Sequence, residues 1–494
     1  MGGMSAPHST LRSLLPSVHA GTAFADAVVW VQDETAVVGA GGWTVLLTGK
    51  DRLRRISELW SRSVKATPQT GTLAMIPVPA AQTGEPRPEP GQRAWVAGTF
   101  SDDSAEPAVL RIPTHWTEQT PAGVRLLVQE VSASALRAAV AVDAAAELAP
   151  HGHMPLPAAA PEAAWDDAGY ADGVRAVLER LGKPAEGPEA TGEILRKVVI
   201  SRTETVPADE DALWAALDQL REAYPQTWVF AVGGLLGATP EMLATRHEGA
   251  VESLVLAGSV PRGATTKADE AAKEHLAADR RMADEHHWAA RSVWEALTPV
   301  LQMDDSKFMP HVLTLPNLHH LATRISGRLK AAGGTVLDVV TRMHPTAAVG
   351  GTPTPDAVRV IAEVEPVDRG RYGAPVGWVD GSGDGEIALA LRCGQAVRAA
   401  EDMAPAGDDD GTGSEGPSGT VGAVAGGEGQ GEPIPDVAVA VRLHAGGGIV
   451  PGADPAEEVT EIGVKFQPMR RALGVDVGAS AIGAMPTPRF QRGC

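Results

Sequence analysis

The chain has 494 residues, of which 44% are hydrophobic and 21% are charged, and its formal net charge at pH 7 is −20. This composition is typical of a globular protein with a large core, and the negative charge argues against nucleic acid or an anionic membrane surface as a partner. Two cysteines are too few for a disulfide framework, no run of 18 apolar residues could span a membrane, and the first residues lack a signal-peptide pattern, so a cytoplasmic protein is expected.

The first third of the chain is rich in short strands. Residues 27–31 and 43–47 are apolar, contain β-branched and aromatic side chains, and adjoin Gly or Asp, which is typical of strands. No pattern in this part suggests chemistry. Residues 21–165 are therefore predicted to supply the sheet and scaffold of the fold, after a flexible N-terminus over residues 1–20.

From Tyr170 onward, helices and strands mix without a regular βαβ rhythm. This mixture favours an α+β fold in which antiparallel sheets pack together and helices lie on the outside. The predicted elements are a helix over 170–181, a strand over 193–203, a helix over 209–223, strands over 227–232 and 252–256, and a long helix over 269–297.

Residues 401–432 differ in composition from the rest of the chain. They carry eight acidic side chains and many glycines, but no lysine or arginine. Such a segment cannot bury enough apolar surface to fold, which predicts a disordered acidic insertion over residues 400–434. The insertion separates the runs 387–397 and 437–443, which we interpret as an antiparallel pair of strands with an expanded connection.

Lys197 stands out because it interrupts the apolar, β-branched run 195–202. On a strand, Lys197, Val199 and Ser201 would share one face. A lysine on an inward face must be paired, solvated in a cleft or partly neutral, because burying an unpaired ammonium is costly. On this segment alone, a lysine that reaches water from an edge strand remains the alternative.

Glutamates supply further candidates. Glu241 follows a buried strand and a glycine turn, which would place it at the end of a sheet, although a solvated loop residue fits the same pattern. Glu458, Glu461 and Lys465 are spaced to share one face of a helix. Two carboxylates without soft ligands nearby would suit Mg²⁺, and a salt-bridged surface face is the alternative.

Residues 445–451 form a glycine-rich run that is predicted to be a loop leaving a strand. Glycines there would let backbone N–H groups approach a carboxylate or oxyanion closely. The run is not a P-loop, because no Gly-Lys-Ser/Thr follows it. Glu285 and His286 adjoin on the predicted long helix, but their spacing is not that of a zinc helix.

Many motifs occur in the order found in the chorismate-utilising enzymes, and the chain resembles that family from residue 170 to residue 473. The family includes isochorismate, salicylate, anthranilate and aminodeoxychorismate synthases. The resemblance implies one large fold, with the catalytic core over 166–475 and a flexible tail over 476–494. The motifs stand at 197–202, 237–241, 256–259, 320–323, 344–346, 376–378, 387–392, 445–451 and 461–465.

Within the family, the sequence is most similar to the isochorismate synthases. Lys197 stands where ammonia-using members typically carry glutamine and water-using members carry lysine. The run 344–353 is similar to the isochorismate synthase version of that loop, with Ala348 where several relatives place threonine. The resemblance implies a Mg²⁺-dependent isomerase that converts chorismate to isochorismate, with menaquinone biosynthesis as the expected pathway.

The resemblance also implies residue roles. Lys197 would be the general base, with a pKa lowered from about 10.4, and Glu241 the general acid, with a raised pKa. Glu285 and Glu461, supported by Glu458, would hold Mg²⁺. The residues implied to bind the substrate are Gly258, Ser259, His320, Ala348, Val349, Tyr372, Arg392, Gly446 and Lys465.

One motif departs from the family pattern. Relatives usually carry Lys-Asp-Arg-x-Glu-His where this chain has Arg-Met-Ala-Asp-Glu-His at 281–286. Three alternatives stay open: a salicylate synthase, which would share nearly every site residue, an isochorismate synthase of a siderophore pathway, and a non-catalytic binding protein. No amidotransferase subunit is expected, and the protein is expected to be a monomer or a weak dimer.

Overall fold

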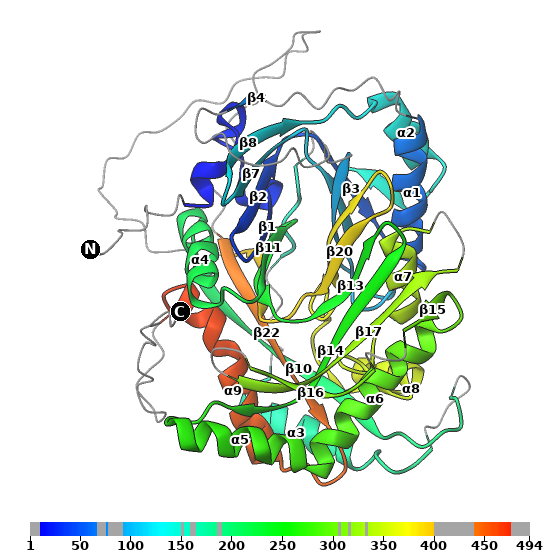
Figure 1. Ribbon diagram of the computed structural model, residues 1–494, viewed down its shortest axis with the longest axis vertical. Coiled ribbons are helices and arrows are strands. Elements are labelled where there is room, and N and C mark those ends of the chain that lie inside the picture. Colours follow the sequence, from blue (N-terminus) through cyan, green and yellow to red (C-terminus); the bar gives the residue numbers. More distant parts are fainter. Residues whose placement is uncertain are drawn as a thin grey trace, which may run out of the picture.

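The computed structural model describes residues 10–66, 76–77, 92–149, 153–158, 165–184, 190–304, 308–314, 318–330, 334–399 and 439–475. Within these residues, two antiparallel sheets of eleven strands each lie face to face, and helices cover their outer sides (Figure 1). This arrangement confirms the α+β prediction. No helix in the described part of the chain is long and apolar enough to cross a membrane. The predicted acidic insertion over 400–434 and the predicted tail over 476–494 lie outside the described residues.

The first sheet carries helices α3, α4, α8 and α9 on its outer side. Its strands, from edge to edge, are β18 (Gly351–Thr352), β10 (Lys197–Ala208), β22 (Val439–Ile449), β21 (Cys393–Arg398), β12 (Leu235–Thr239), β11 (Trp228–Val232), β1 (Val28–Gln32), β2 (Thr35–Ala40), β7 (His115–Thr120), β8 (Gly123–Val128) and β4 (Ile76–Pro77). The helices are α3 (Asp167–Leu178), α4 (Glu210–Ala223), α8 (Thr354–Val364) and α9 (Pro455–Ala472).

The second sheet carries helices α1, α2, α5, α6 and α7. Its strands, in order, are β15 (Leu301–Met303), β17 (Leu318–Leu329), β14 (Ala250–Pro261), β13 (Met242–His247), β20 (Gly385–Leu389), β19 (Pro375–Asp380), β5 (Arg93–Ala97), β6 (Ala108–Ile112), β3 (Trp43–Leu47) and β9 (Ala146–Leu148), with β16 (His311–Thr314) beside β17. The helices are α1 (Arg52–Ala66), α2 (Ala133–Ala141), α5 (Thr266–Ala278), α6 (Arg280–Leu297) and α7 (Val336–Met343).

Strand alternation divides the core into two layers. On β1, Val28 and Trp30 belong to the apolar cluster that also contains residues of the second sheet, whereas Val29 and Val31 belong to the larger cluster that includes the helices. Strands from the first third of the chain pair with strands of the later part in both sheets, β1 with β11 and β5 with β19. The two parts therefore share one pair of sheets.

Two predicted segments differ from the structure. In place of a flexible segment over residues 10–20, the chain forms two 3-10 helices, Arg12–Leu14 and Ser17–His19, and Leu11 is fully buried. The predicted long helix over 269–297 is two helices, α5 and α6. Asp279 breaks it, because its backbone is extended and its carboxylate accepts a hydrogen bond from the Met282 N–H at 3.0 Å, which caps α6.

The chain crosses between the two sheets at two adjacent places. After β12 of the first sheet, Pro240 and Glu241 lead directly into β13 of the second. In the opposite direction, residues 390–392 lead from β20 of the second sheet into β21 of the first. The predicted single strand over 387–397 is therefore two strands in different sheets, while its predicted antiparallel pairing beyond the insertion is confirmed by β21 and β22.

The two crossings run antiparallel in one register. Gly237 lies opposite Cys393 before the crossing and Met242 lies opposite Ala388 after it, so both chains use the same number of residues to pass between the sheets. Two backbone hydrogen bonds tie the crossings together, from Ala238 N to Arg392 O at 3.2 Å and from Leu389 N to Glu241 O at 3.0 Å. The crossings form one rigid ladder, and it fixes Glu241 and Arg392 relative to each other.

Candidate active site

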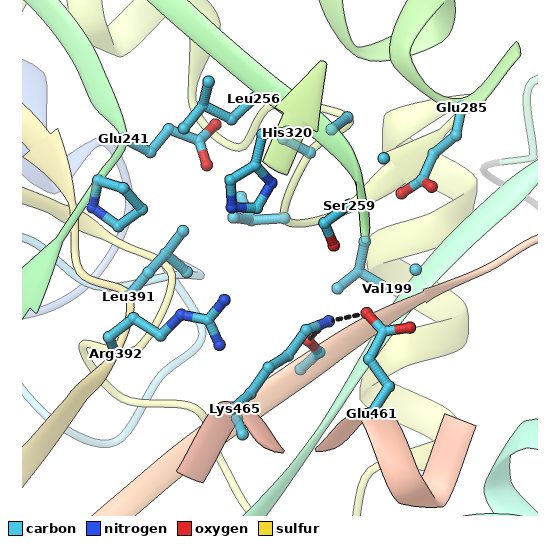
Figure 2. Close-up of a pocket in the computed structure, with 18 of the residues that line it drawn as sticks. Val199, Glu241, Leu256, Ser259, Glu285, His320, Leu391, Arg392, Glu461 and Lys465 are labelled. Atoms are coloured by element: carbon cyan, nitrogen blue, oxygen red, sulfur yellow. Dashed lines mark hydrogen bonds and ion pairs between the residues drawn. The ribbon is translucent and has the colours of Figure 1, made fainter. Parts of the chain in front are cut away.

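A pocket lies beside the two crossings, and strands of both sheets together with α6 and α9 line it (Figure 2). The structure brings together every residue that was predicted for the site, although their chemical roles stay predictions. These lining residues are Lys197, Glu241, Gly258, Ser259, Glu285, His320, Ala348, Val349, Tyr372, Arg392, Gly446, Glu458, Glu461 and Lys465.

Lys197 begins β10 and is only 1% exposed. β10 lies between β18 and β22, so the alternative of a lysine on a solvated edge is wrong. The Lys197 Nζ lies 2.9 Å from Oε1 of Glu285, which approaches from α6. An ammonium buried in the strand is thus offset by a carboxylate from a helix, as the cost of burying an unpaired charge requires.

Glu241 lies in the first crossing and is 6% exposed, so the solvated-loop alternative for this residue is wrong too. Burial raises its pKa to about 8, although the charge of Lys197 and a backbone hydrogen bond with Leu256 act in the opposite direction. A carboxyl group with that pKa is protonated at neutral pH and can donate a proton. Figure 2 shows its carboxyl group within the pocket.

Two cationic side chains and a neutral histidine meet in the pocket. The guanidinium of Arg392 and the ammonium of Lys465 both point toward the middle of the pocket, with His320 above them (Figure 2). Burial, followed by the charges of Arg392 and Lys465, lowers the pKa of His320 to about 3, so this ring is neutral. An anionic ligand would meet two fixed cations and a neutral imidazole.

Arg392 is held in an unusual backbone conformation. Its φ is +50°, in the left-handed region that residues with a side chain seldom adopt. The residue is the last one of the second crossing and precedes β21, so the turn of the chain aims its side chain at the pocket. Such local strain is common where a functional side chain must be presented.

A bulge in β14 shapes the wall opposite β10. The pairing of β14 with β17 shifts register between Ala257 and Ser259, and Gly258 between them has a φ of +74°. A Cβ on Gly258 would also lie 3.2 Å from Met282, which packs against it from α6. The bulge leaves Ser259 opposite His320, and its hydroxyl points into the pocket (Figure 2).

The predicted glycine loop is mostly a strand. Gly446, Gly447 and Gly448 lie within β22, paired with residues of β10. Their lack of a side chain leaves space for neighbouring side chains. A Cβ on Gly446 would lie 2.6 Å from the Tyr372 hydroxyl oxygen, and one on Gly448 would lie 2.8 Å from both Glu285 Oε1 and the Cε of Lys197. Glycine is therefore needed for these groups to lie against the strand.

The remaining predicted substrate residues lie near that strand. Ala348 and Val349 follow α7 and line the pocket. Tyr372 is 6% exposed, and burial raises the pKa of its hydroxyl, which therefore stays protonated and can donate a hydrogen bond. Lys465 on α9 donates a hydrogen bond to the Gly446 carbonyl at 2.8 Å and pairs with Glu461 at 2.6 Å.

The three carboxylates predicted to hold Mg²⁺ come from two helices. Glu285 approaches on α6 and pairs with Lys197, while Glu461 on α9 pairs with Lys465. Glu458, one turn earlier on α9, has an oxygen 3.1 Å from where a Cβ on Gly447 would lie, close to the buried Tyr170. Within the described residues, no three acidic, histidine or cysteine side chains are gathered as a metal site.

The donor set nevertheless suits a hard cation. All three candidate ligands are carboxylates, which Mg²⁺ prefers, and no sulfur ligand competes among the residues that line the pocket apart from the thioether of Met282. The two lysines already neutralise two of the carboxylates. The donor atoms fit Mg²⁺ chemically, and in this structure a lysine ammonium lies beside an oxygen of Glu285 and of Glu461.

Sequence reasoning missed several residues of the pocket, chiefly His444 and Met282. His444 is buried on β22 two residues before Gly446, so strand alternation places both on one face. That spacing could have identified it. Met282 precedes Glu285 by one helical turn on α6, and the same argument from helical spacing would have placed it beside the carboxylate.

Two bacterial relatives are similar in sequence to more than half of the chain. The chain is 33% identical over 312 residues to a Mycobacterium tuberculosis protein provisionally named isochorismate synthase MenF, covering 60% of this chain and 73% of the relative. It is 31% identical over 320 residues to the isochorismate synthase DhbC of Bacillus subtilis, covering 62% and 68%.

Solved structures show the same fold. The menaquinone-specific isochorismate synthase MenF of Escherichia coli superposes with a TM-score of 0.62 at 21% identity, over 95% of this chain and 92% of that one. The family model described as "Chorismate binding enzyme" matches residues 185–403 and 438–474, which is more than half of the chain. With its many ordered motifs and its relatives, the chain belongs to the chorismate binding enzyme family.

Proposed function

We propose that the protein is an isochorismate synthase, an isomerase that adds water at C2 of chorismate and releases the C4 hydroxyl. The observation that carries the proposal is the pair Lys197 and Glu241, both buried in one pocket, with the pKa of Glu241 raised to about 8. The names of the relatives support the same reaction. Lysine rather than glutamine at position 197 favours water over ammonia as the nucleophile.

Binding relies on charge. Chorismate carries two carboxylates, and Arg392 and Lys465 both point into the pocket. The planar guanidinium of Arg392 can pair with a carboxylate through two parallel hydrogen bonds. The Tyr372 hydroxyl, protonated and beside Gly446, would donate a further bond to the same group. These groups would fix the ring between Lys197 and Glu241, which is the orientation that the reaction needs.

Proton transfer follows from the two buried groups. As the oxygen of a water molecule forms its bond to C2, Lys197 would act as the general base and take the proton that the water loses. As the bond from C4 to its hydroxyl oxygen breaks, protonated Glu241 would give its proton to that oxygen. One water molecule is consumed and one is released, so the reaction is an isomerisation without oxidation or reduction.

Glu285 and Glu461, with Glu458 in support, would hold Mg²⁺. The ion, when bound, would neutralise a carboxylate of the substrate. We place the reaction in menaquinone biosynthesis. The menaquinone-specific isochorismate synthase of Escherichia coli, which has the same fold, supports this pathway.

The decisive experiment is incubation of the protein with chorismate and Mg²⁺, followed by chromatographic identification of the product. Isochorismate is expected. Salicylate together with pyruvate would instead identify a salicylate synthase, and binding of chorismate without any turnover would identify a non-catalytic binding protein. Restored menaquinone synthesis in a bacterial strain that lacks its own isochorismate synthase would support the pathway, and rescue of siderophore synthesis alone would contradict it.

A further inference from the structure

His444 lies on the pocket face of β22 and has no place in the reaction described above. It is 3% exposed, and strand alternation puts it on the same face as Arg442 and Gly446. It also lines the pocket. A buried imidazole in that position needs a physical account, and its neighbours supply one.

The imidazole of His444 stacks on the ring of Tyr372. The two ring centroids are 5.1 Å apart and the planes differ by only 13°. The guanidinium of Arg369 lies 6.0 Å from the centroid of the same tyrosine ring. Gly446 leaves the tyrosine hydroxyl its space, because a Cβ there would lie 2.6 Å from the oxygen. The position of the hydroxyl is thus set by the groups around its ring.

A buried polar chain fixes His444 in turn. Nε of Arg442 donates a hydrogen bond to Nε2 of His444 at 3.3 Å, and Arg442 also forms an ion pair with Glu106. Glu106 is shared with Arg371, whose Nη1 lies 3.5 Å from Oε2. Because Nε2 accepts a bond, the ring proton is on Nδ1. A neutral ring is consistent with its surroundings, because burial and nearby arginines lower the pKa of His444 well below its usual value.

We propose that His444 is a positioning residue that acts through Tyr372, holding the tyrosine hydroxyl at Gly446 where it binds a carboxylate of the substrate. The inference rests on the proposed function and adds a specific means of substrate orientation to it. Arg442 and Glu106 extend the support to the segment just before β6, so the N-terminal part of the chain would contribute to the pocket without touching the substrate. His444 itself is assigned no proton transfer.

A double-mutant cycle tests whether His444 acts through the tyrosine hydroxyl. KM, kcat and chorismate affinity would be measured for His444→Ala, Tyr372→Phe and the double variant. Tyr372→Phe is expected to raise KM by about tenfold or more, the usual effect of losing a hydrogen bond to a charged group. His444→Ala should raise KM similarly with kcat nearly unchanged, and it should add little once Tyr372 is phenylalanine.

Two further variants separate positioning from general damage. His444→Phe keeps a flat ring against Tyr372 and should restore most of the affinity that His444→Ala loses. Leu443→Ala is the matched control, because Leu443 is fully buried on the opposite face of β22. It should lower the melting temperature at least as much as His444→Ala while leaving KM near that of the wild type.

The proposal would be overturned by equal effects of His444→Ala in the tyrosine and phenylalanine backgrounds, or by a phenylalanine variant as impaired as the alanine variant. An equal rise in KM for Leu443→Ala would assign the effect to general destabilisation instead. Failure of the proposed function is recognised separately, because the wild-type protein would then form no isochorismate from chorismate, and no variant is needed to see it.

Discussion

The pocket has two sides that hold charge in different ways. The first, which we call the strand wall, comes from strands and crossings, and the second, the helix rim, comes from α6 and α9. The side chain of Lys197 on the wall is 2% exposed, whereas those of Glu285 and Glu461 on the rim are 21% and 46% exposed. The wall consists of Lys197, Glu241 and Arg392, and the rim of Glu285, Glu461 and Lys465.

This difference separates two tasks. Burial raises the pKa of Glu241 on the wall to about 8, and a general acid that works at neutral pH requires such a raised pKa. The rim is more exposed to water, so a carboxylate there can bind a cation at a lower desolvation cost. We infer that the strand wall performs proton transfer and that the helix rim binds the cation. The predictions below test that division.

The largest effect is expected for Lys197→Gln. Loss of a general base typically lowers the rate by roughly 10²–10⁴-fold, so kcat should fall by about that factor while chorismate affinity changes little. The matched control is Lys465→Gln on the rim, which should weaken binding more than it lowers kcat. Near-normal turnover of Lys197→Gln at saturating chorismate would mean that this lysine only pairs with a carboxylate.

Glu285→Gln should break the rim. The amide keeps the shape of the side chain but removes a charge at the proposed ion. Loss of a residue that only hydrogen-bonds a metal ligand typically lowers metal affinity by about 10–100-fold, so the Mg²⁺ affinity measured by calorimetry should fall by more than that. Glu461→Gln should behave alike, whereas Glu241→Gln should leave Mg²⁺ affinity unchanged. Normal metal affinity in Glu285→Gln would show that another residue is the ligand and that the altered motif at 281–286 misled the assignment.

The raised pKa of Glu241 predicts two pH effects. Turnover should fall as the pH rises through about 8, because the acid loses its proton. The free energy of unfolding should also depend on the protonation of Glu241. Its folded-state pKa lies above the unfolded value of about 4.3, so its contribution is full below that value and is lost as the pH rises toward 8.

Glu241→Gln supplies the reference for this stability measurement. Between pH 5 and 8 the free energy of unfolding of the wild type should decrease relative to that of the variant, by roughly 1.4 kcal/mol for each pH unit over which only the unfolded state is ionised. Urea titrations at several pH values would measure it. A constant difference across this range would show that Glu241 is ionised in the folded protein.

The smallest effect concerns the backbone of Arg392. Glycine tolerates a φ of +50°, so Arg392→Gly should be more stable than Arg392→Ala by about 1 kcal/mol, although both lose substrate affinity. Lys465 inside α9 is the control, because there glycine should be less stable than alanine by about 1 kcal/mol. If the glycine variant were less stable than the alanine variant at both positions in urea unfolding, the backbone conformation of Arg392 would carry no strain.

Part of this site could be predicted from the sequence. Lys197 was recognisable because a lysine in a β-branched run is costly unless it is paired, and Glu458 and Glu461 because helical spacing puts them on one face. The fold class and the gathering of the site residues followed from the order of the family motifs. Such inferences depend on local patterns or on resemblance, and the structure agrees with them.

Other parts depend on contacts between distant segments, which local patterns do not contain. Glycines 446–448 resemble a loop, but they pair with β10 as part of a strand. Glycine occurs there because the side chains of Tyr372, Lys197 and Glu285 occupy the space that a Cβ would need. His444 gains its partner only through the fold. The division of residues 387–397 between two sheets likewise follows from pairing with β12 and β13, which no alternation within the segment reveals.

The ladder of the two crossings has a consequence for evolution and design. Because the two segments use the same number of residues to pass between the sheets, a residue inserted beside Glu241 would have to be matched by one beside Arg392. Otherwise it would shift the pairing on one side or form a further bulge like the one between Met242 and Ala244. The lengths of the two segments should therefore change together among relatives. Grafting either segment alone from another member should fail, whereas exchanging both as a unit should preserve the spacing between Glu241 and Arg392.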